Sequence, residues 1–195
     1  MALHYQPEKT TSPEGDIFVE QWLMVQMLAH LAPNGWLVYV KEHNSQFAER
    51  LYGEQGRTHD FYERLAGFEN VKLIVNDTSS FDLIDSAKAV ATVTGTVGLE
   101  SVIRSVPVLS FGHAWYALCE GIFTIKENEE LIKTFEKIEH GYQIEAKKVD
   151  EFLYAIENIS TPCYLNPGNR AGVSFGEKEN LENLVTCLMT HAEGE

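Results

Sequence analysis

The sequence is short of basic residues and lacks any long apolar run. Its 195 residues include 29 Asp and Glu but only 15 Lys and Arg, which gives a formal net charge of −14. A chain this acidic repels the phosphate backbone of nucleic acids, so we expect no nucleic-acid partner. No stretch approaches the roughly 18 apolar residues of a membrane-spanning helix, and the start of the chain lacks the pattern of a signal peptide. We therefore expect no transmembrane segment.

Cysteine is also scarce. Cys119, Cys163 and Cys187 are far apart, odd in number and without a C-x-x-C pair. This pattern predicts neither a disulfide framework nor a zinc site. The sequence has no H-x-x-x-H or D-x-D motif and no carboxylate cluster, so we expect no metal and no cofactor. A cytoplasmic location is the simplest setting for such cysteines.

What the sequence does have is an alternation of short apolar runs with segments of helical periodicity. The strand-like runs are 2–5, 36–41, 71–75, 89–93, 106–111 and 122–125. The helical segments between them are 16–31, 45–53, 58–67, 80–87 and 96–105. This alternation predicts an α/β fold, a Rossmann-like parallel sheet flanked by helices.

The character of the chain changes after residue 126. Helical patterns at 128–138, 149–159 and 179–191 follow one another, with a connector rich in Pro, Gly and Asn at 161–176. No strong linker divides the chain. We therefore expect a single domain over residues 1–195, with a helical C-terminal extension from about residue 126. The chain begins inside its first expected strand, from which we expect an upstream region to be missing.

Ligands of doubly wound sheets bind beyond the carboxyl ends of the strands. The loop after 89–93 reads TGTVGLE, in which Gly95 allows a tight turn and close backbone approach. Thr94 or Thr96 can cap the next helix, and free N–H groups at a helix start bind anions. Glu100 is placed to accept hydrogen bonds from sugar or ribose hydroxyls. A plain strand–helix turn is the alternative interpretation.

Two further loops follow expected strands. Lys41 and His43 come at the end of 36–41, where both can meet a phosphate, and a histidine can protonate or hydrogen-bond a departing phosphate near neutral pH. His113 follows 106–111 beside aromatic residues and can line a base or sugar pocket. A solvated polar loop in the first case, and core aromatics in the second, remain open as alternatives.

Taken in order, these segments resemble a known family. LHYQPE, YVKEHNSQF, a DFYERL…NVKLI stretch and ATVTGTVGLESVIRSVPVLSFGHAWY look like the C-terminal half of the capsule polysaccharide biosynthesis family, proteins similar to bacterial Kdo transferases of capsule assembly. The resemblance covers about residues 2–125. It implies one half of a GT-B architecture, in which two Rossmann-like domains face a cleft and the C-terminal domain holds the nucleotide of an activated sugar. We expect the N-terminal domain of that architecture to be absent here.

The resemblance also assigns roles to residues. It implies that His43 is the catalytic group near the donor phosphate, within a segment that matches K-E-H-P. Lys41 of the same segment is expected to bind the donor. The other expected donor-binding residues are His113 and those that match the remaining family motifs: Thr94, Gly95, Thr96, Glu100, Gln6 and Glu8. Where the family has Pro after that histidine, this chain has Asn44, which removes a residue that would stiffen the loop.

The expected function is therefore donor binding in a glycosyltransferase of capsule or surface polysaccharide synthesis. The expected partners are a CMP- or UDP-linked sugar and a polysaccharide or lipid-linked acceptor, in the cytoplasm or at the inner face of the cell membrane. Inverting and retaining transfer both remain open, as does activity of this chain alone. Two alternatives also remain: a GT-B-fold enzyme similar to nucleotide-sugar 2-epimerases, and a non-catalytic module that binds a nucleotide or a partner.

Overall fold

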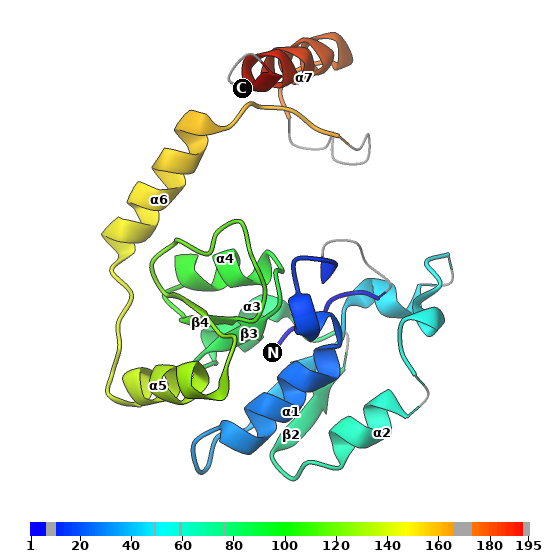
Figure 1. Ribbon diagram of the computed structural model, residues 1–195, viewed down its shortest axis with the longest axis vertical. Helices are drawn as coiled ribbons and strands as arrows, with labels where there is room; N and C mark the ends of the chain where they lie inside the picture. Colours follow the sequence, from blue (N-terminus) through cyan, green and yellow to red (C-terminus); the bar gives the residue numbers. More distant parts are fainter. Residues whose placement is uncertain (7–10, 49, 59, 76, 166–172, 193–195) are drawn as a thin grey trace. The chain divides into compact units, whose positions relative to one another are not determined.

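The computed structural model of the chain describes residues 1–6, 11–48, 50–58, 60–75, 77–165 and 173–192 (Figure 1). Glu8, one of the expected donor-binding residues, lies outside them. The chain forms two compact units, Met1–Phe152 and Leu153–Glu195. The first unit contains the parallel sheets and, as shown below, the polar cleft.

The helices and strands follow the expected alternation. The α-helices of the first unit are α1 (Gln21–Leu31), α2 (Phe61–Ala66), α3 (Ser80–Asp85), α4 (Val97–Ile103), α5 (Asn128–Glu139) and the start of α6 (Ala146–Ile159), with 3₁₀ helices η2 (Asp16–Val19), η3 (Asn44–Phe47) and η4 (Gly53–Gln55). The strands are β1 (Val38–Lys41), β2 (Val71–Ile74), β3 (Val90–Thr92), β4 (Val108–Ser110) and β5 (Ile122–Thr124).

Every pairing between these strands is parallel. β1 pairs with β2 in the register Val38↔Val71, and β3, β4 and β5 form a second sheet in that order. The N-terminal segment joins the two sheets, because Ala2 bridges Lys41 in parallel and donates its N–H to the Ala91 carbonyl at 3.0 Å. The combined order is β2–β1–N-terminal segment–β3–β4–β5. This is the order of nucleotide-binding Rossmann sheets, and its switch point lies between the N-terminal segment and β3. The predicted α/β fold with a parallel sheet is confirmed.

The first expected strand, 2–5, is much shorter than the sequence predicts. Pairing ends after Leu3, whose N–H donates to the Lys41 carbonyl at 2.9 Å. The next residue, His4, turns out of the sheet because side chains bind its backbone. Its N–H donates to Gln21 Oε1 at 2.7 Å, and its carbonyl accepts from Arg57 Nη2 at 2.8 Å. The chain therefore leaves the sheet directly at the switch point.

The expected helices at 45–53 and 58–67 are also corrected. The first is replaced by η3 and η4, and the second shrinks to α2. Tyr52 takes a left-handed backbone conformation with φ of 53°, which interrupts a helix. The Gln46 side chain then bridges the loops, because its Nε2 donates to the Gly53 carbonyl and its Oε1 accepts from the Gln6 N–H.

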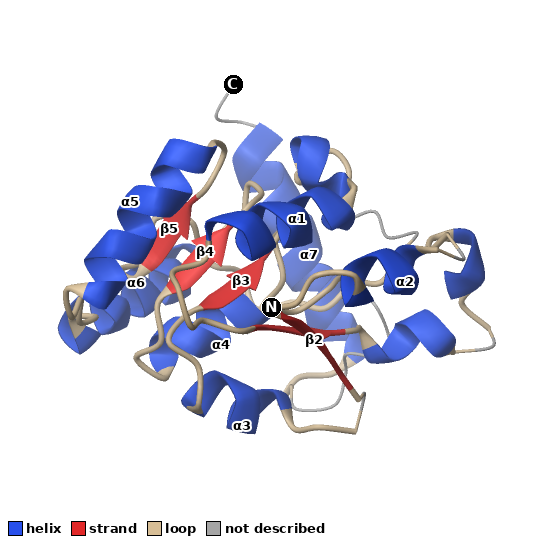
Figure 2. Cartoon of the chain, turned by 90° about the horizontal axis from the view of Figure 1, so that it is seen from below, coloured by secondary structure: helices blue, strands red, loops and turns tan. Residues whose placement is uncertain are grey.

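Helices cover both faces of β3–β5, as the parallel sheet requires (Figure 2). α1 and α5 pack on one face, and α3 and α4 lie on the other. The core of the first face joins Met24 and Leu28 of α1 to Leu131 and Phe135 of α5 over Ala91 of β3. This burial fixes the strands whose carboxyl ends carry the polar loops.

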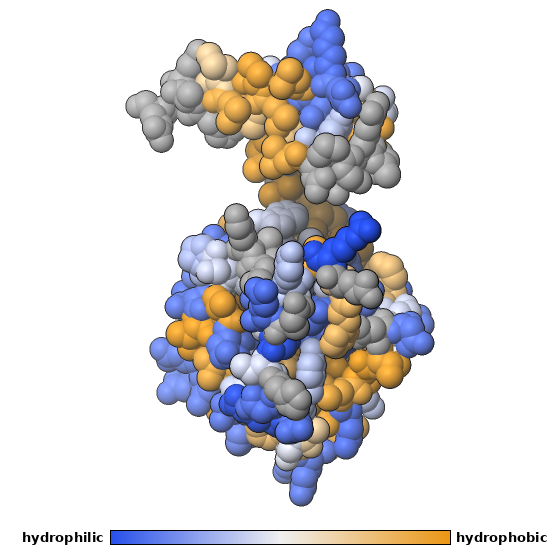
Figure 3. Space-filling model, turned by 90° about the vertical axis from the view of Figure 1, so that its right-hand side faces the viewer, coloured by the Kyte–Doolittle hydropathy of each residue, from blue (hydrophilic) through white to orange (hydrophobic). Residues whose placement is uncertain are grey.

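The second unit consists of the end of α6, a connector and α7 (Glu177–Ala192). Asn180 fixes its connector to α7: Asn180 Oδ1 accepts from the Tyr164 N–H at 2.7 Å, and its Nδ2 donates to the Tyr164 carbonyl at 3.0 Å. The unit exposes apolar side chains, among them Leu181 and Leu188 (Figure 3). No helix in the described part of the chain combines the length and apolarity needed to span a membrane.

Candidate functional site

A polar cleft of about 850 Å³ lies beyond the carboxyl ends of the strands, at the switch point of the sheet. Most of the residues singled out from the sequence line it: Lys41, His43, Thr94, Gly95, Thr96, Glu100 and His113. They come from the end of β1, from the loops after β1, β3 and β4, and from the start of α4. Gln6 does not line the cleft, because its side chain donates to Thr11 Oγ1 at 2.8 Å.

His4 holds the turn after β3 through its buried side chain. The sequence interpretation gave this residue no role. His4 is buried, and its Nε2 accepts the Thr94 N–H at 3.2 Å and lies 3.1 Å from Thr92 Oγ1. The Gly95 N–H donates to the same Thr92 hydroxyl at 3.3 Å. Two amides expected to be free for an anion are therefore already bound within the protein.

The expected threonine cap of α4 is not formed either. Thr96 precedes the helix, but its side chain bonds no backbone N–H of the first turn. Its hydroxyl instead donates to Glu100 Oε1 at 3.4 Å. This pairing brings a hydroxyl and a carboxylate together on the wall of the cleft, which suits hydroxyl groups of a ligand better than an anion.

Tyr116 fixes the same turn from the other side. Its ring is fully buried, and its hydroxyl donates to the Gly95 carbonyl. Burial, with a smaller contribution from the Glu100 carboxylate, raises the pKa of Tyr116 above its usual value, so it stays a donor. A Cβ on Gly98 would clash with the hydroxyl oxygen of the buried Tyr116, so only glycine fits there. The sequence interpretation missed this contact, although aromatics after β4 pointed to the region.

His43 has a defined ring orientation. Its Nδ1 accepts the Ser45 N–H at 3.1 Å, where the ring caps η3. Because Nδ1 is the acceptor, the proton of the neutral ring is assigned to Nε2. The exposed ring therefore offers an N–H donor at Nε2. The cap orders the ring with Asn44 as the next residue.

One cation and two carboxylates set the charge of the cleft. Lys41 Nζ donates to Ser80 Oγ at 2.9 Å, which ties the end of β1 to the start of α3. Glu14 and Glu100 add negative charge, while Glu42 is paired with Arg57. Within the described residues, no group of three or more His, Cys, Asp or Glu side chains is placed to hold a metal ion.

Aromatic surface borders the cleft on the β4 side. The His113 N–H donates to the Glu14 carbonyl at 2.8 Å, which fixes the loop, and the His113 ring is exposed. Trp115 lines the cleft while 58% exposed, and its ring stacks on Phe152 at a centroid distance of 6.4 Å. A supported, exposed indole can stack on a base or on a sugar ring.

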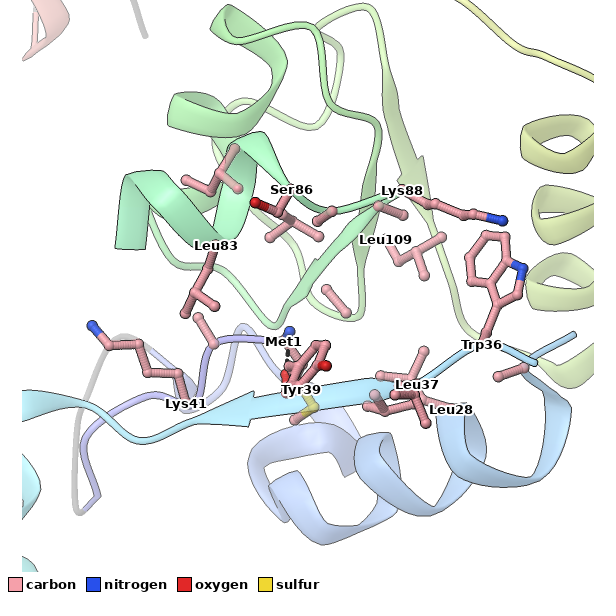
Figure 4. A pocket seen from close by; sticks show the side chains of 18 of the residues that line it. Met1, Leu28, Trp36, Leu37, Tyr39, Lys41, Leu83, Ser86, Lys88 and Leu109 are labelled. Atoms are coloured by element: carbon pink, nitrogen blue, oxygen red, sulfur yellow. Dashed lines mark hydrogen bonds between the residues drawn. The ribbon is translucent and has the colours of Figure 1, made fainter. Parts of the chain in front are cut away.

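A second hollow, an apolar cavity of about 370 Å³, lies between β1 and β3 (Figure 4). The N-terminal segment bridges these strands only around Ala2, and the cavity occupies the space between them toward their other ends. Leu28, Leu37 and Leu109 point into it, and Lys88 covers its rim with Nζ 4.8 Å from the centre of the Trp36 ring. Of the described residues that are expected to bind a donor, only Lys41 lines it.

Comparison with known proteins gives the family of the chain. A family model described as capsule polysaccharide biosynthesis protein matches residues 18–140, which include the loops after β1, β3 and β4. Comparisons with curated proteins and with solved structures gave no match. The matched region spans more than half of the chain. The chain therefore belongs to the capsule polysaccharide biosynthesis family.

Proposed function

We propose that the polar cleft binds the nucleotide part of an activated sugar, and that the first unit is the donor-binding domain of a GT-B glycosyltransferase in capsule polysaccharide synthesis. The observation that carries the proposal is the convergence of Lys41, His43 and Glu100 on one cleft at the switch point of a Rossmann-like sheet. Family membership supports a role in capsule synthesis, and the cleft chemistry supports the nucleotide-linked donor.

Each polar group has a part in this proposal. The Lys41 ammonium and the His43 Nε2–H are the cation and the hydrogen-bond donor on the β1 side of the cleft. Both face the phosphate. Glu100, with Thr96 at its side, accepts hydrogen bonds from ribose hydroxyls. Trp115 offers a stacking surface for the base or the sugar.

The transfer itself breaks the bond between the anomeric carbon and the phosphate oxygen. Negative charge develops on that oxygen as the bond breaks, and groups already oriented toward it lower the barrier. Lys41 and His43 are the groups we propose for this role. The anomeric carbon forms its new bond to a hydroxyl oxygen of the acceptor. The base that takes the proton of that hydroxyl belongs to the complete transferase, for which we propose a second Rossmann-like domain facing this cleft.

Calorimetry with CMP, UDP and AMP, without divalent metal, tests the proposal. We expect binding of CMP or UDP with a Kd of about 1 mM or tighter, which corresponds to about −4 kcal/mol. Lys41→Ala should weaken it, whereas Lys72→Ala, an exposed lysine on β2 away from the cleft, should not. A folded protein that binds none of the three nucleotides at millimolar concentration contradicts the proposal.

A further inference from the structure

We infer that Arg57 is a positioning residue for His43: through Glu42, it holds the loop after β1 so that the His43 Nε2–H faces the cleft. The inference rests on the proposed function for its ligand. Arg57 does not itself line the cleft, and none of the sequence motifs described above contains it. It acts through the contacts of one buried carboxylate.

The Arg57–Glu42 pair is bidentate and buried. Arg57 Nε lies 3.0 Å from Glu42 Oε2, and Nη2 lies 3.2 Å from Oε1. Both side chains are only 6% exposed. A planar guanidinium that meets both oxygens of a carboxylate fixes the orientation of that carboxylate, as a single ammonium does not. The pair therefore sets the direction in which the remaining lone pairs of Glu42 point.

Those remaining lone pairs hold the loop. Glu42 Oε1 accepts the backbone N–H of His43 at 2.8 Å, and Oε2 accepts the Tyr62 hydroxyl at 2.8 Å. Burial and the hydrogen bond to Glu42 raise the pKa of Tyr62, so the phenol keeps its proton and remains a donor. Glu42 is thus fixed from three directions, and its contact with the His43 amide fixes the backbone that carries the imidazole.

Arg57 also reaches the other side of the switch point. Its Nη2 donates to the His4 carbonyl at 2.8 Å, and the His4 ring accepts the Thr94 N–H. The ring of Phe61 packs under the guanidinium, 4.7 Å from Cζ to the ring centre. One side chain therefore connects the loop that carries His43 to the turn that carries Thr96 and Glu100. A change at Arg57 should reach His43 first, because the Glu42 carboxylate that Arg57 orients is the group that binds the His43 amide. His4, by contrast, binds Arg57 through its backbone carbonyl and Thr94 through its ring.

The ring proton of His43 gives a readout that needs no ligand. Long-range ¹H–¹⁵N spectra distinguish the Nε2–H and Nδ1–H forms of each histidine. The structure predicts Nε2–H for His43, whose Nδ1 accepts from Ser45, and Nδ1–H for His140, whose Nδ1 lies 2.6 Å from the Glu136 carbonyl. His140 is therefore an internal reference with the opposite assignment.

The variant to test is Arg57→Lys. It keeps the positive charge but cannot form the bidentate contact with the Glu42 carboxylate. We expect His43 to change from a single Nε2–H form to a mixture of forms while His140 stays unchanged. Arg64→Lys is the matched control, because Arg64 is an exposed arginine of the neighbouring α2 that pairs with Asp60. If Arg57→Lys does not fold, Tyr62→Phe replaces it, since it removes one of the bonds that orient Glu42. A folded variant in which His43 keeps the pure Nε2–H form overturns the inference.

Binding measurements then separate the inference from the proposed function. Arg57→Lys should weaken CMP or UDP about 10-fold and leave the bare nucleoside within about 2-fold, the pattern expected on loss of one charge-assisted hydrogen bond. Combined with His43→Ala, it should cause no further loss, because the two changes remove the same contact. Additive losses in this cycle overturn the positioning role. Failure of the unaltered protein to bind any nucleotide rejects the proposed function alone, because the ring-proton spectra still decide the role of Arg57.

Discussion

The two hollows of the first unit differ in composition and in their place on the sheet. The cavity of about 370 Å³ lies between β1 and β3 and is lined mainly by aliphatic side chains from strands and helices. The cleft of about 850 Å³ lies where the same strands end and is lined by loops. The contrast shows that strand direction decides where the polar groups gather. Parallel strands deliver their following loops to one edge, so polar groups far apart in sequence meet there.

The loops that carry the polar groups of the cleft are held by hydrogen bonds from other side chains. His4 and Tyr116 hold the turn after β3, and Glu42 with Arg57 holds the loop after β1. On the cavity wall, Leu28 and Leu109 are instead buried in the packed core. Changes in the two regions should therefore separate stability from ligand binding.

The largest expected effect is on the free energy of unfolding, when the buried Glu42–Arg57 pair beside the cleft is broken. Glu42→Ala leaves the Arg57 guanidinium buried without its carboxylate, which costs about 3–5 kcal/mol in the free energy of unfolding. Urea denaturation measures it. Asp85→Ala is the control, because Asp85 forms an exposed ion pair with Arg104, and it should leave the midpoint nearly unchanged. Equal, small shifts for both variants would mean that the buried pair is not needed to hold the loop.

A change on the cavity side should affect stability alone. Leu109→Ala, at a residue that is 2% exposed and borders the apolar cavity, should cost about 2–5 kcal/mol. At a temperature where the variant is still folded, its affinity for CMP or UDP should equal that of the unaltered protein. Loss of nucleotide affinity in the folded variant would show that the two hollows are coupled.

His43→Ala should lower the affinity for nucleotide without lowering stability. The ring is exposed and caps only the short helix η3, so the unfolding midpoint should hardly move. Affinity for the phosphorylated nucleotide should fall by roughly 1.5–3 kcal/mol, the value of a charge-assisted hydrogen bond, while the nucleoside binds as before. Glu100→Gln should instead weaken both ligands, because both contain the ribose. Calorimetry with matched nucleotide and nucleoside decides between these patterns.

The smallest effect at neutral pH is expected at Tyr116. Burial raises its pKa above the usual 10.0, so the folded protein binds this proton more tightly than the unfolded chain does. Its contribution to stability is therefore complete below about pH 10 and is lost as the pH rises above that value. In the Tyr116→Phe variant, the free energy of unfolding should therefore decrease less steeply above about pH 10 than it does in the unaltered protein. An unchanged alkaline profile would contradict the burial of this hydroxyl.

The sequence predicted the alternation of strands and helices, because apolar periodicity reports which faces are buried. It also placed Glu100 and Lys41 at the carboxyl edge of the sheet, since the residues that follow a parallel strand must lie there. It missed His4 and Arg57. His4 sits in a run that reads as a strand, and Arg57 follows its partner Glu42 by 15 residues. Neither has a local signal, because their partners are brought close only by the tertiary fold.

The central claim is that the polar cleft, and not the apolar cavity, is the ligand site. Backbone amide spectra recorded during a titration with CMP and UDP test it most directly, because each hollow has its own reporter residues. We predict saturable shifts at His43, Thr96 and Glu100, with Leu37 and Ala89 on the cavity wall unchanged. Shifts confined to Leu37 and Ala89, or none at millimolar nucleotide, would contradict it.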